Sequence, residues 1–188
     1  MLSNINLATL NNKHAVSSTF ILMAEISEES CREAIAWILE ANMAEPENQP
    51  DALNLIICSG GGCVHSALAL IDIMRGSSIP VRTIGLGQIA SAGLFIFMAG
   101  QKGMRTLTEN TSIMSHRFSS GMMGKSHELV SIQKEFTLTS ERIINLYKKF
   151  TGMKEAEVKQ FLLPAEDVWL TAKEALKYGL CDLIKDLK

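Results

Sequence analysis

Hydrophobic and polar residues follow two different periods in the first hundred residues. Short apolar runs, typical of buried strands, alternate with segments in which apolar residues recur at the spacing of one helix face. The expected strands are 20–23, 53–58 and 81–86, and the expected helices are 28–43, a segment around 67–74, and one that begins at Ser91. This alternation predicts an α/β fold in which right-handed βαβ units build a parallel sheet.

The second half of the chain carries a longer helical pattern. The segment 124–150 keeps apolar residues at helical spacing far longer than the others do, which predicts a long helix that projects from the body. Short strands are expected at 104–107 and 112–115, and further helices at 154–161 and 172–178. We expect one domain over residues 19–188, preceded by an Asn- and Ser-rich arm at 1–18.

Composition excludes several functional classes. The net charge of −2 gives no basic surface for nucleic acid, and no apolar run reaches the roughly 18 residues that a membrane helix needs. The N-terminus lacks a signal-peptide pattern, so a cytoplasmic protein is expected. The cysteines form no CxxC pair and have no clustered histidines, which predicts reduced thiols and neither a disulfide framework nor a metal site. They are Cys31, Cys58, Cys63 and Cys181.

Two glycine-rich segments follow expected strands and are the first candidates for chemistry. They are the turns at 59–62 and 85–93, and ligands of α/β proteins gather at the carboxyl ends of strands. Backbone N–H groups in the first turn could hold a phosphate, or they could form an oxyanion hole for a developing negative charge. The turn lacks both the GxGxxG pattern and the Lys-Ser/Thr pair of a P-loop, which argues against a nucleotide.

Ser91 lies in the second turn, and the residues alone leave two interpretations of it open. Serine is a common helix N-cap, which contributes about 1 kcal/mol to stability. As a nucleophile, Ser91 would need a base and an acid that orients the base. His116 follows the expected strand at 112–115 and is the candidate base. Asp167 precedes the apolar run 168–170 and is the candidate acid, with a carboxylate expected to be semi-buried.

Several stretches, taken in order, resemble a known family. SGGG, GQIASAG, a strand that ends in histidine, a long helix and EDVWLTAKEALKYGLCD follow the order found in the proteolytic subunit of the Clp protease family. The similarity covers about residues 19–185. The resemblance implies an α/β fold shared by Clp peptidases and crotonases, with repeated ββα or βαβ units and a projecting long helix. The residues that match the family motifs are Gln88, Ala90, Ser91, Gly93, Ala172, Glu174, Ala175, Tyr178, Gly179, Leu180 and Asp182.

The resemblance also implies a mechanism and the residues that perform it. Ser91 falls on the nucleophile, His116 on the general base and Asp167 on the orienting acid, while Gly62 and Ala92 fall on the N–H groups of the oxyanion hole. The implied protein is a serine endopeptidase that hydrolyses unfolded polypeptides by acyl transfer, with no metal and no cofactor in this chain. Positions implied to bind substrate are Gly61, Cys63, Val64, Arg117, Phe118 and Ser119.

Members of the family work as assemblies, and the resemblance extends to them. It implies a homo-oligomer in which heptameric rings stack in pairs as a tetradecamer and enclose the active sites. A separate AAA+ unfoldase uses ATP and feeds polypeptides into the chamber. The arm at 1–18 would be the axial segment, and the helix at 124–150 would form the contact between rings. This chain has no ATP motif of its own, in agreement with a separate ATPase.

Three departures from the family pattern modify this expectation. Gly60 replaces a proline, residues 117–121 replace a stretch that lines the substrate channel, and Glu166 replaces an arginine that pairs across rings. They predict an altered cleavage preference and an altered contact between rings. Two alternatives are an inactive structural ring subunit and a crotonase-type acyl-CoA enzyme. The presence of all three candidate catalytic residues argues against the first, and the serine nucleophile and the short chain argue against the second.

Overall fold

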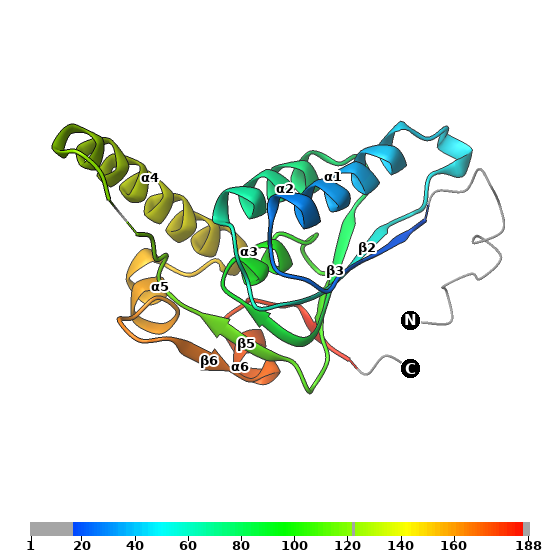
Figure 1. Cartoon of the computed structure of the whole chain (residues 1–188). Coiled ribbons are helices and arrows are strands. Elements are labelled where there is room, and N and C mark those ends of the chain that lie inside the picture. The colour runs from blue at the N-terminus through cyan, green and yellow to red at the C-terminus, as the bar shows by residue number, and fades with distance from the viewer. Residues whose placement is uncertain (1–16, 122, 186–188) are drawn as a thin grey trace.

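The computed structural model describes residues 17–121 and 123–185, which contain a mostly parallel seven-stranded sheet (Figure 1). β1 (Thr19–Leu22), β2 (Leu53–Ser59), β3 (Val81–Ala90), β4 (Arg105–Leu107) and β7 (Leu183–Ile184) are neighbours in that order, and all of these pairs are parallel. β5 (Ser112–Ser115) runs parallel to the second half of β3, and β6 (Val168–Leu170) pairs with β5 in the antiparallel direction. The predicted α/β fold is confirmed.

The helices lie beside the sheet, and one of them leaves the body. Helices α1 (Glu28–Met43) and α2 (Val64–Gly76) lie side by side over one face of the sheet, and α3 (Ala92–Met98) packs beside α2. The shorter helices are η3 (Pro46–Asn48), α5 (Glu155–Phe161) and α6 (Ala172–Lys177). Helix α4 (Ser126–Thr151) projects from the body in Figure 1, and its buried side chains all lie in its second half.

Local sequence signals explain where the first helix begins. Ser27 Oγ accepts a hydrogen bond from the N–H of Ser30 at 3.1 Å, and Ser30 Oγ accepts one from the N–H of Ser27 at 3.0 Å. This reciprocal pair is a capping box, and the glutamates in the first turn complement the helix dipole. Helix α1 therefore covers the predicted range 28–43.

Strand β3 is longer than expected and replaces most of the predicted turn at 85–93. Its first half pairs with β4 and its second half with β5, and Gly87 lies between the halves with a φ of 58°. Glycine adopts that conformation without strain. A Cβ added at Gly85 would lie 2.6 Å from Cδ2 of Leu107, so this position also needs glycine. The prediction of a turn before residue 91 was wrong, because these glycines serve the change of strand partner, and the chain turns at Ser91.

Two short strands were not predicted, and part of one expectation lies outside the described residues. β6 and β7 contain three and two residues, which is too few for a periodic pattern. Residues 1–16 of the expected arm at 1–18 are outside the described residues. Within the parts of the chain that the structure describes, no helix is both long and apolar enough to cross a membrane.

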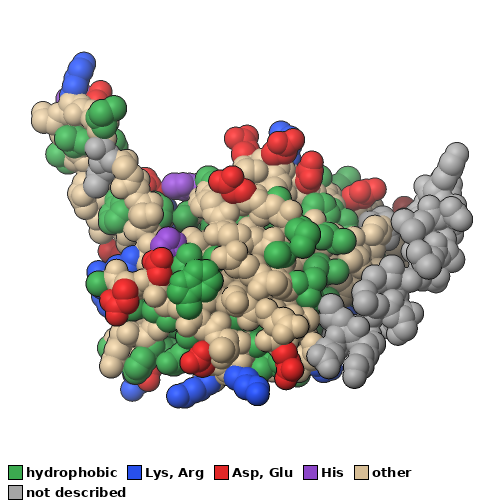
Figure 2. Space-filling view, turned by 60° about the horizontal axis from the view of Figure 1, so that its bottom comes forward, with side chains coloured by type: hydrophobic (Ala, Val, Ile, Leu, Met, Phe, Trp, Pro, Cys, Tyr) green, Lys and Arg blue, Asp and Glu red, His purple; other side chains and the backbone are tan. Residues whose placement is uncertain are grey.

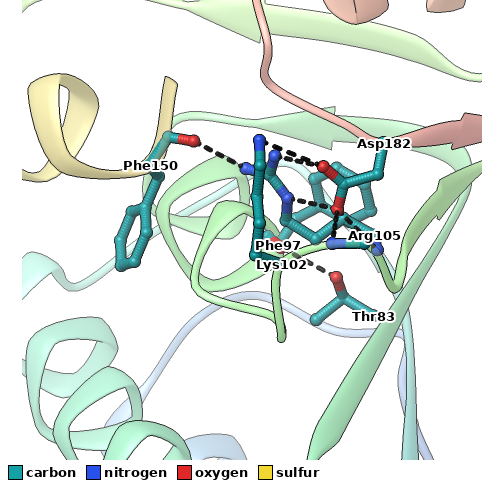
Figure 3. A network of polar contacts seen from close by, with 7 residues as sticks. Thr83, Phe97, Lys102, Arg105, Phe150 and Asp182 are labelled. Atoms are coloured by element: carbon teal, nitrogen blue, oxygen red, sulfur yellow. Dashed lines mark hydrogen bonds and ion pairs between the residues drawn. The ribbon is translucent and has the colours of Figure 1, made fainter. Parts of the chain in front are cut away.

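A buried ion pair joins the C-terminal segment to the sheet (Figure 3). The Arg105 side chain is 1% exposed and donates to Asp182 from Nε at 2.8 Å and from Nη2 at 2.6 Å. It also donates to the carbonyl oxygen of Phe150 at the end of α4, at 3.1 Å. Burial alone would raise the pKa of Asp182, but hydrogen bonds from Arg105 outweigh burial and hold that pKa well below its usual range. The pair thus fixes β4, the end of α4 and the C-terminal segment to one another.

Candidate active site

Ser91 occupies a strained turn between β3 and α3. It has a φ of 52° and a ψ of −124°, and it is the one residue other than glycine with a positive φ in the described ranges. Such a conformation costs about 1–3 kcal/mol and persists only when the surroundings impose it. Here the Ser91 N–H donates to the carbonyl of Met114 at 3.0 Å, and every residue of α3 is buried. Ser91 is the N-cap residue of α3 by position, but its side chain makes no capping hydrogen bond, so the expected capping role of the hydroxyl was wrong.

The loop after β2 presses against this turn. Gly61 and Gly62 have φ values of 101° and 142°, and a Cβ added at Gly61 would lie 2.7 Å from Cβ of Ser91. A Cβ added at Gly62 would lie 2.2 Å from the carbonyl oxygen of Ile26. The loop is held there because the Ile26 N–H donates to the Gly61 carbonyl at 2.8 Å and the Cys63 N–H donates to the Ile26 carbonyl at 2.7 Å. Only glycine fits at these two positions, since a side chain would displace the loop or the nucleophile turn.

The N–H groups of Gly62 and Ala92 are both free to bind a ligand. Neither donates a hydrogen bond to an acceptor within residues 17–121 and 123–185. The two groups belong to segments in close contact, because a Cβ at Gly61 would lie 3.2 Å from the Ala92 nitrogen. Free, preorganised donors next to a nucleophile can stabilise an oxyanion. The geometry is therefore compatible with the predicted oxyanion hole.

The structure brings Ser91 and His116 into direct contact and leaves Asp167 slightly apart. His116 Nε2 lies 2.7 Å from Ser91 Oγ, which is a good hydrogen-bond distance. His116 Nδ1 lies 3.7 Å from Asp167 Oδ1, which is an ion-pair distance and too long for a hydrogen bond. The Asp167 side chain is 60% exposed, against 26% for His116. The expectation of a semi-buried carboxylate was wrong, because Asp167 lies in the exposed segment just before β6.

A cleft of about 230 Å³ opens beside Ser91 and His116. Four of the residues predicted to bind substrate line it, and two do not. Arg117 turns away, since its Nε donates to the carbonyl oxygen of Leu163 at 2.9 Å, and Gly61 lies behind Ser91. The lining residues are Gly62, Cys63, Val64, Ser91, Phe95, His116, Phe118 and Ser119.

Phe95 is a cleft residue that the sequence analysis missed. It lies four residues after Ser91 in α3, and residues four apart share a helix face. That spacing was the available signal, but the sequence analysis assigned no residue of α3 beyond Ala92 to the site. Phe95 is 2% exposed and still reaches the cleft, so it belongs both to the core and to the candidate site.

One cysteine also lines the cleft. Cys63 is exposed at the rim of the cleft, and hydrogen bonds with Ser66 lower the pKa of its thiol. Among the residues that the structure describes, no group of three or more His, Cys, Asp or Glu side chains could hold a metal ion. The main reactive pair of the cleft is thus the Ser91 hydroxyl, on a strained backbone, and the His116 imidazole that it contacts.

Helix α4 packs behind the cleft and does not line it. Phe118, which lines the cleft, stacks on Phe136 of α4 with ring centroids 5.2 Å apart. On the other side of Phe118 lies a cavity of about 380 Å³ with an apolar wall from α4. His65 of α2 adds a second bridge to α4, because its Nε2 lies 2.9 Å from Oε1 of Glu135. Figure 2 shows histidine side chains at the base of the α4 arm, where it meets the body.

Comparisons with known proteins show what the whole chain is similar to. The model of the family described as Clp protease matches residues 7–188. The chain is also similar to a protein of Nocardia farcinica (strain IFM 10152), the ATP-dependent Clp protease proteolytic subunit 2. The two are 32% identical over 162 residues, which is 86% of this chain and 77% of the relative.

Proposed function

Because this chain belongs to the Clp protease family and is a Clp-type peptidase, we propose that it is a serine endopeptidase subunit. It would cleave unfolded polypeptides with Ser91 as the nucleophile. The observation that carries the proposal is the 2.7 Å contact between Ser91 Oγ and His116 Nε2, made by a serine whose backbone is held in a strained turn. A serine that only began a helix would need neither feature.

The proposed reaction is acyl transfer in two steps. Ser91 Oγ attacks the carbonyl carbon of the scissile peptide bond while His116 Nε2 takes the hydroxyl proton. The negative charge that develops on the carbonyl oxygen is stabilised by the N–H groups of Gly62 and Ala92. The C–N bond then breaks, and His116 returns the proton to the leaving amine, which leaves an acyl-enzyme on Ser91. Water, deprotonated by His116, attacks that ester and releases Ser91 with its proton restored.

Asp167 would orient the imidazole from the solvent side. Ser91 can donate to Nε2 only when the proton of the neutral ring is on Nδ1, which faces Asp167 at 3.7 Å. A carboxylate there favours this tautomer and the imidazolium formed during attack. Since Asp167 is exposed, solvent screens this interaction more than it would screen a buried one.

We extend the proposal to the assembly and its partners. The chain would form heptameric rings that stack as a tetradecamer in the cytoplasm, and a separate AAA+ unfoldase would use ATP, so that this chain needs no cofactor. The relative's name, an ATP-dependent proteolytic subunit, supports this division of labour. Large apolar side chains exposed on β1, on the residue after it and on α1 offer surface for subunit contacts. They are Ile21, Met23, Leu39 and Met43. Figure 2 shows that apolar side chains also gather on the face turned to the viewer.

The test is covalent labelling of Ser91 by a fluorophosphonate probe, followed by intact-mass analysis. We expect one probe per subunit in the wild type and none in Ser91→Ala, together with hydrolysis of an unfolded casein substrate that Ser91→Ala lacks. An assembled wild-type protein that never labels would instead identify an inactive structural subunit. Particle images of the same sample test the ring, because the absence of seven-fold symmetry would contradict the assembly.

A further inference from the structure

Both chain neighbours of His116 are tied to the segment that leads into β6. Ser115 Oγ lies 2.5 Å from the carbonyl oxygen of Leu162, and Arg117 Nε donates to the carbonyl oxygen of Leu163 at 2.9 Å. The two acceptors are consecutive peptide groups. His116 therefore lies at the centre of a two-point attachment that limits how far the end of β5 can shift.

Tyr147 of α4 adds a third contact to this attachment. Its side chain is fully buried, and its hydroxyl lies 2.5 Å from Ser115 Oγ. A carbonyl oxygen can only accept, so Ser115 donates to Leu162, and the Tyr147 hydroxyl must be the donor to Ser115. Burial raises the pKa of Tyr147 well above its usual range, so the phenol keeps the proton that this bond requires.

The same tyrosine ring also packs against the helix that carries the nucleophile. It meets Phe95 edge-on, with centroids 5.8 Å apart and an interplanar angle of 83°. The Phe95 N–H donates to the Ser91 carbonyl at 3.3 Å, and its side chain lines the cleft. One side chain of α4 thus contacts both the strand that ends at His116 and the helix that begins after Ser91.

We propose that Tyr147 is a positioning residue that aligns His116 with Ser91 through the hydroxyl of Ser115. The inference rests on the proposed serine peptidase function and names a residue for it. Tyr147 does not line the cleft, so it would act on the chemical step and not on substrate binding. A displacement of about 1 Å at a reacting group can cost on the order of 10²-fold in rate. Loss of the hydroxyl should therefore reduce kcat about 10- to 100-fold and leave KM nearly unchanged.

The test compares hydroxyl deletions at both ends of this bond, with hydrolysis of a fluorogenic peptide and the rate of fluorophosphonate labelling as readouts. Tyr147→Phe keeps the ring and its contact with Phe95, and we expect about a 10-fold or greater fall in kcat and in labelling rate. Ser115→Ala should behave in the same way, and Ser115→Thr, which retains a hydroxyl, should recover most of the activity. The double variant should be no slower than the slower single variant, because both changes remove one interaction.

Thr139→Val is the matched control, because it deletes another buried hydroxyl of α4 that has no contact with β5 in the described structure. Its kcat should equal that of the wild type. A merely structural role for Tyr147 would lower Tm in Tyr147→Phe and leave the kcat of the assembled protein unchanged, which would overturn the inference. Should Tyr147→Phe fail to fold, the Ser115 pair of variants decides. A wild type that never labels overturns the proposed function as well, whereas a labelled wild type with an equally fast Tyr147→Phe overturns this inference alone.

Discussion

The buried pair of Arg105 and Asp182 leads to a quantitative prediction for Asp182→Ala. The carboxylate accepts from Arg105 Nε and Nη2, from the Arg105 N–H at 3.1 Å and from the Gly103 N–H at 2.8 Å. Removing it leaves a guanidinium that is 1% exposed and whose one remaining acceptor, among the residues that the structure describes, is the Phe150 carbonyl. Removing one partner of a buried pair costs about 3–5 kcal/mol. That loss is a large part of the roughly 5–15 kcal/mol by which a domain is stable.

The assay is urea unfolding followed by far-UV circular dichroism at one fixed protein concentration. Lys102→Gln is the matched control, since Lys102 contacts the same carboxylate at 3.2 Å but is 71% exposed. An exposed pair contributes about 0–1 kcal/mol, so this variant should unfold close to the wild-type midpoint. The double variant Arg105→Met with Asp182→Leu should recover most of the loss, because no unpaired charge remains buried. A loss below about 1 kcal/mol in Asp182→Ala would refute the reasoning.

The same pair predicts how stability depends on pH. The pKa of Asp182 is lower in the folded protein than the ordinary value of 3.8. A lowered folded pKa gives stability that is fully present above the unfolded value and is lost as the pH falls through the folded value. The difference in unfolding free energy between wild type and Asp182→Ala should therefore be constant near neutral pH and shrink below about pH 4. A difference that grew on acidification would contradict the direction of this shift.

Two further predictions concern the candidate site. Gly62→Ala should reduce peptidase activity by on the order of 10²-fold or more, because a Cβ would lie 2.2 Å from the Ile26 carbonyl oxygen and displace an oxyanion donor. Gly60→Ala is the control, since its added Cβ has no atom within 4 Å, and it should stay within about twofold of wild type in the same peptide assay. Asp167→Asn should lower kcat about 10- to 100-fold, which is less than the ~10⁴-fold loss for a buried triad acid, because Asp167 is 60% exposed. Added salt should slow the wild type more than this variant, and equal salt responses would contradict the role of the Asp167 charge.

Much of the fold could be predicted because its elements carry strong local signals. The range of α1 follows from the capping box at Ser27 and from apolar residues at helical spacing. β3 was predicted too short because Gly85 and Gly87 are typical of turns, while here they permit close packing and a change of strand partner. A single sequence does not distinguish these two uses of glycine, because the difference lies in a neighbour from another part of the chain.

The sequence predicted which residues are candidates for the site better than it predicted how they are arranged. Motif order made Ser91, His116 and Asp167 the candidates, and the structure places the first two in contact. The exposure of Asp167 depends on how the segment before β6 lies, and no local pattern encodes that. The role of Arg105 was missed for a similar reason. It stands in a buried strand of only three residues, and its partner Asp182 is 77 residues away in the chain.

The strained backbone of Ser91 sets activity against stability at a single residue. Glycine adopts a φ of 52° freely, so Ser91→Gly would release part of the roughly 1–3 kcal/mol held in this turn, while Ser91→Ala would keep that strain. An inactive subunit with glycine at this position should therefore outlast the active one in the cell. Selection for stability alone would favour glycine at this position, so the strain measures what the proposed nucleophile costs the fold.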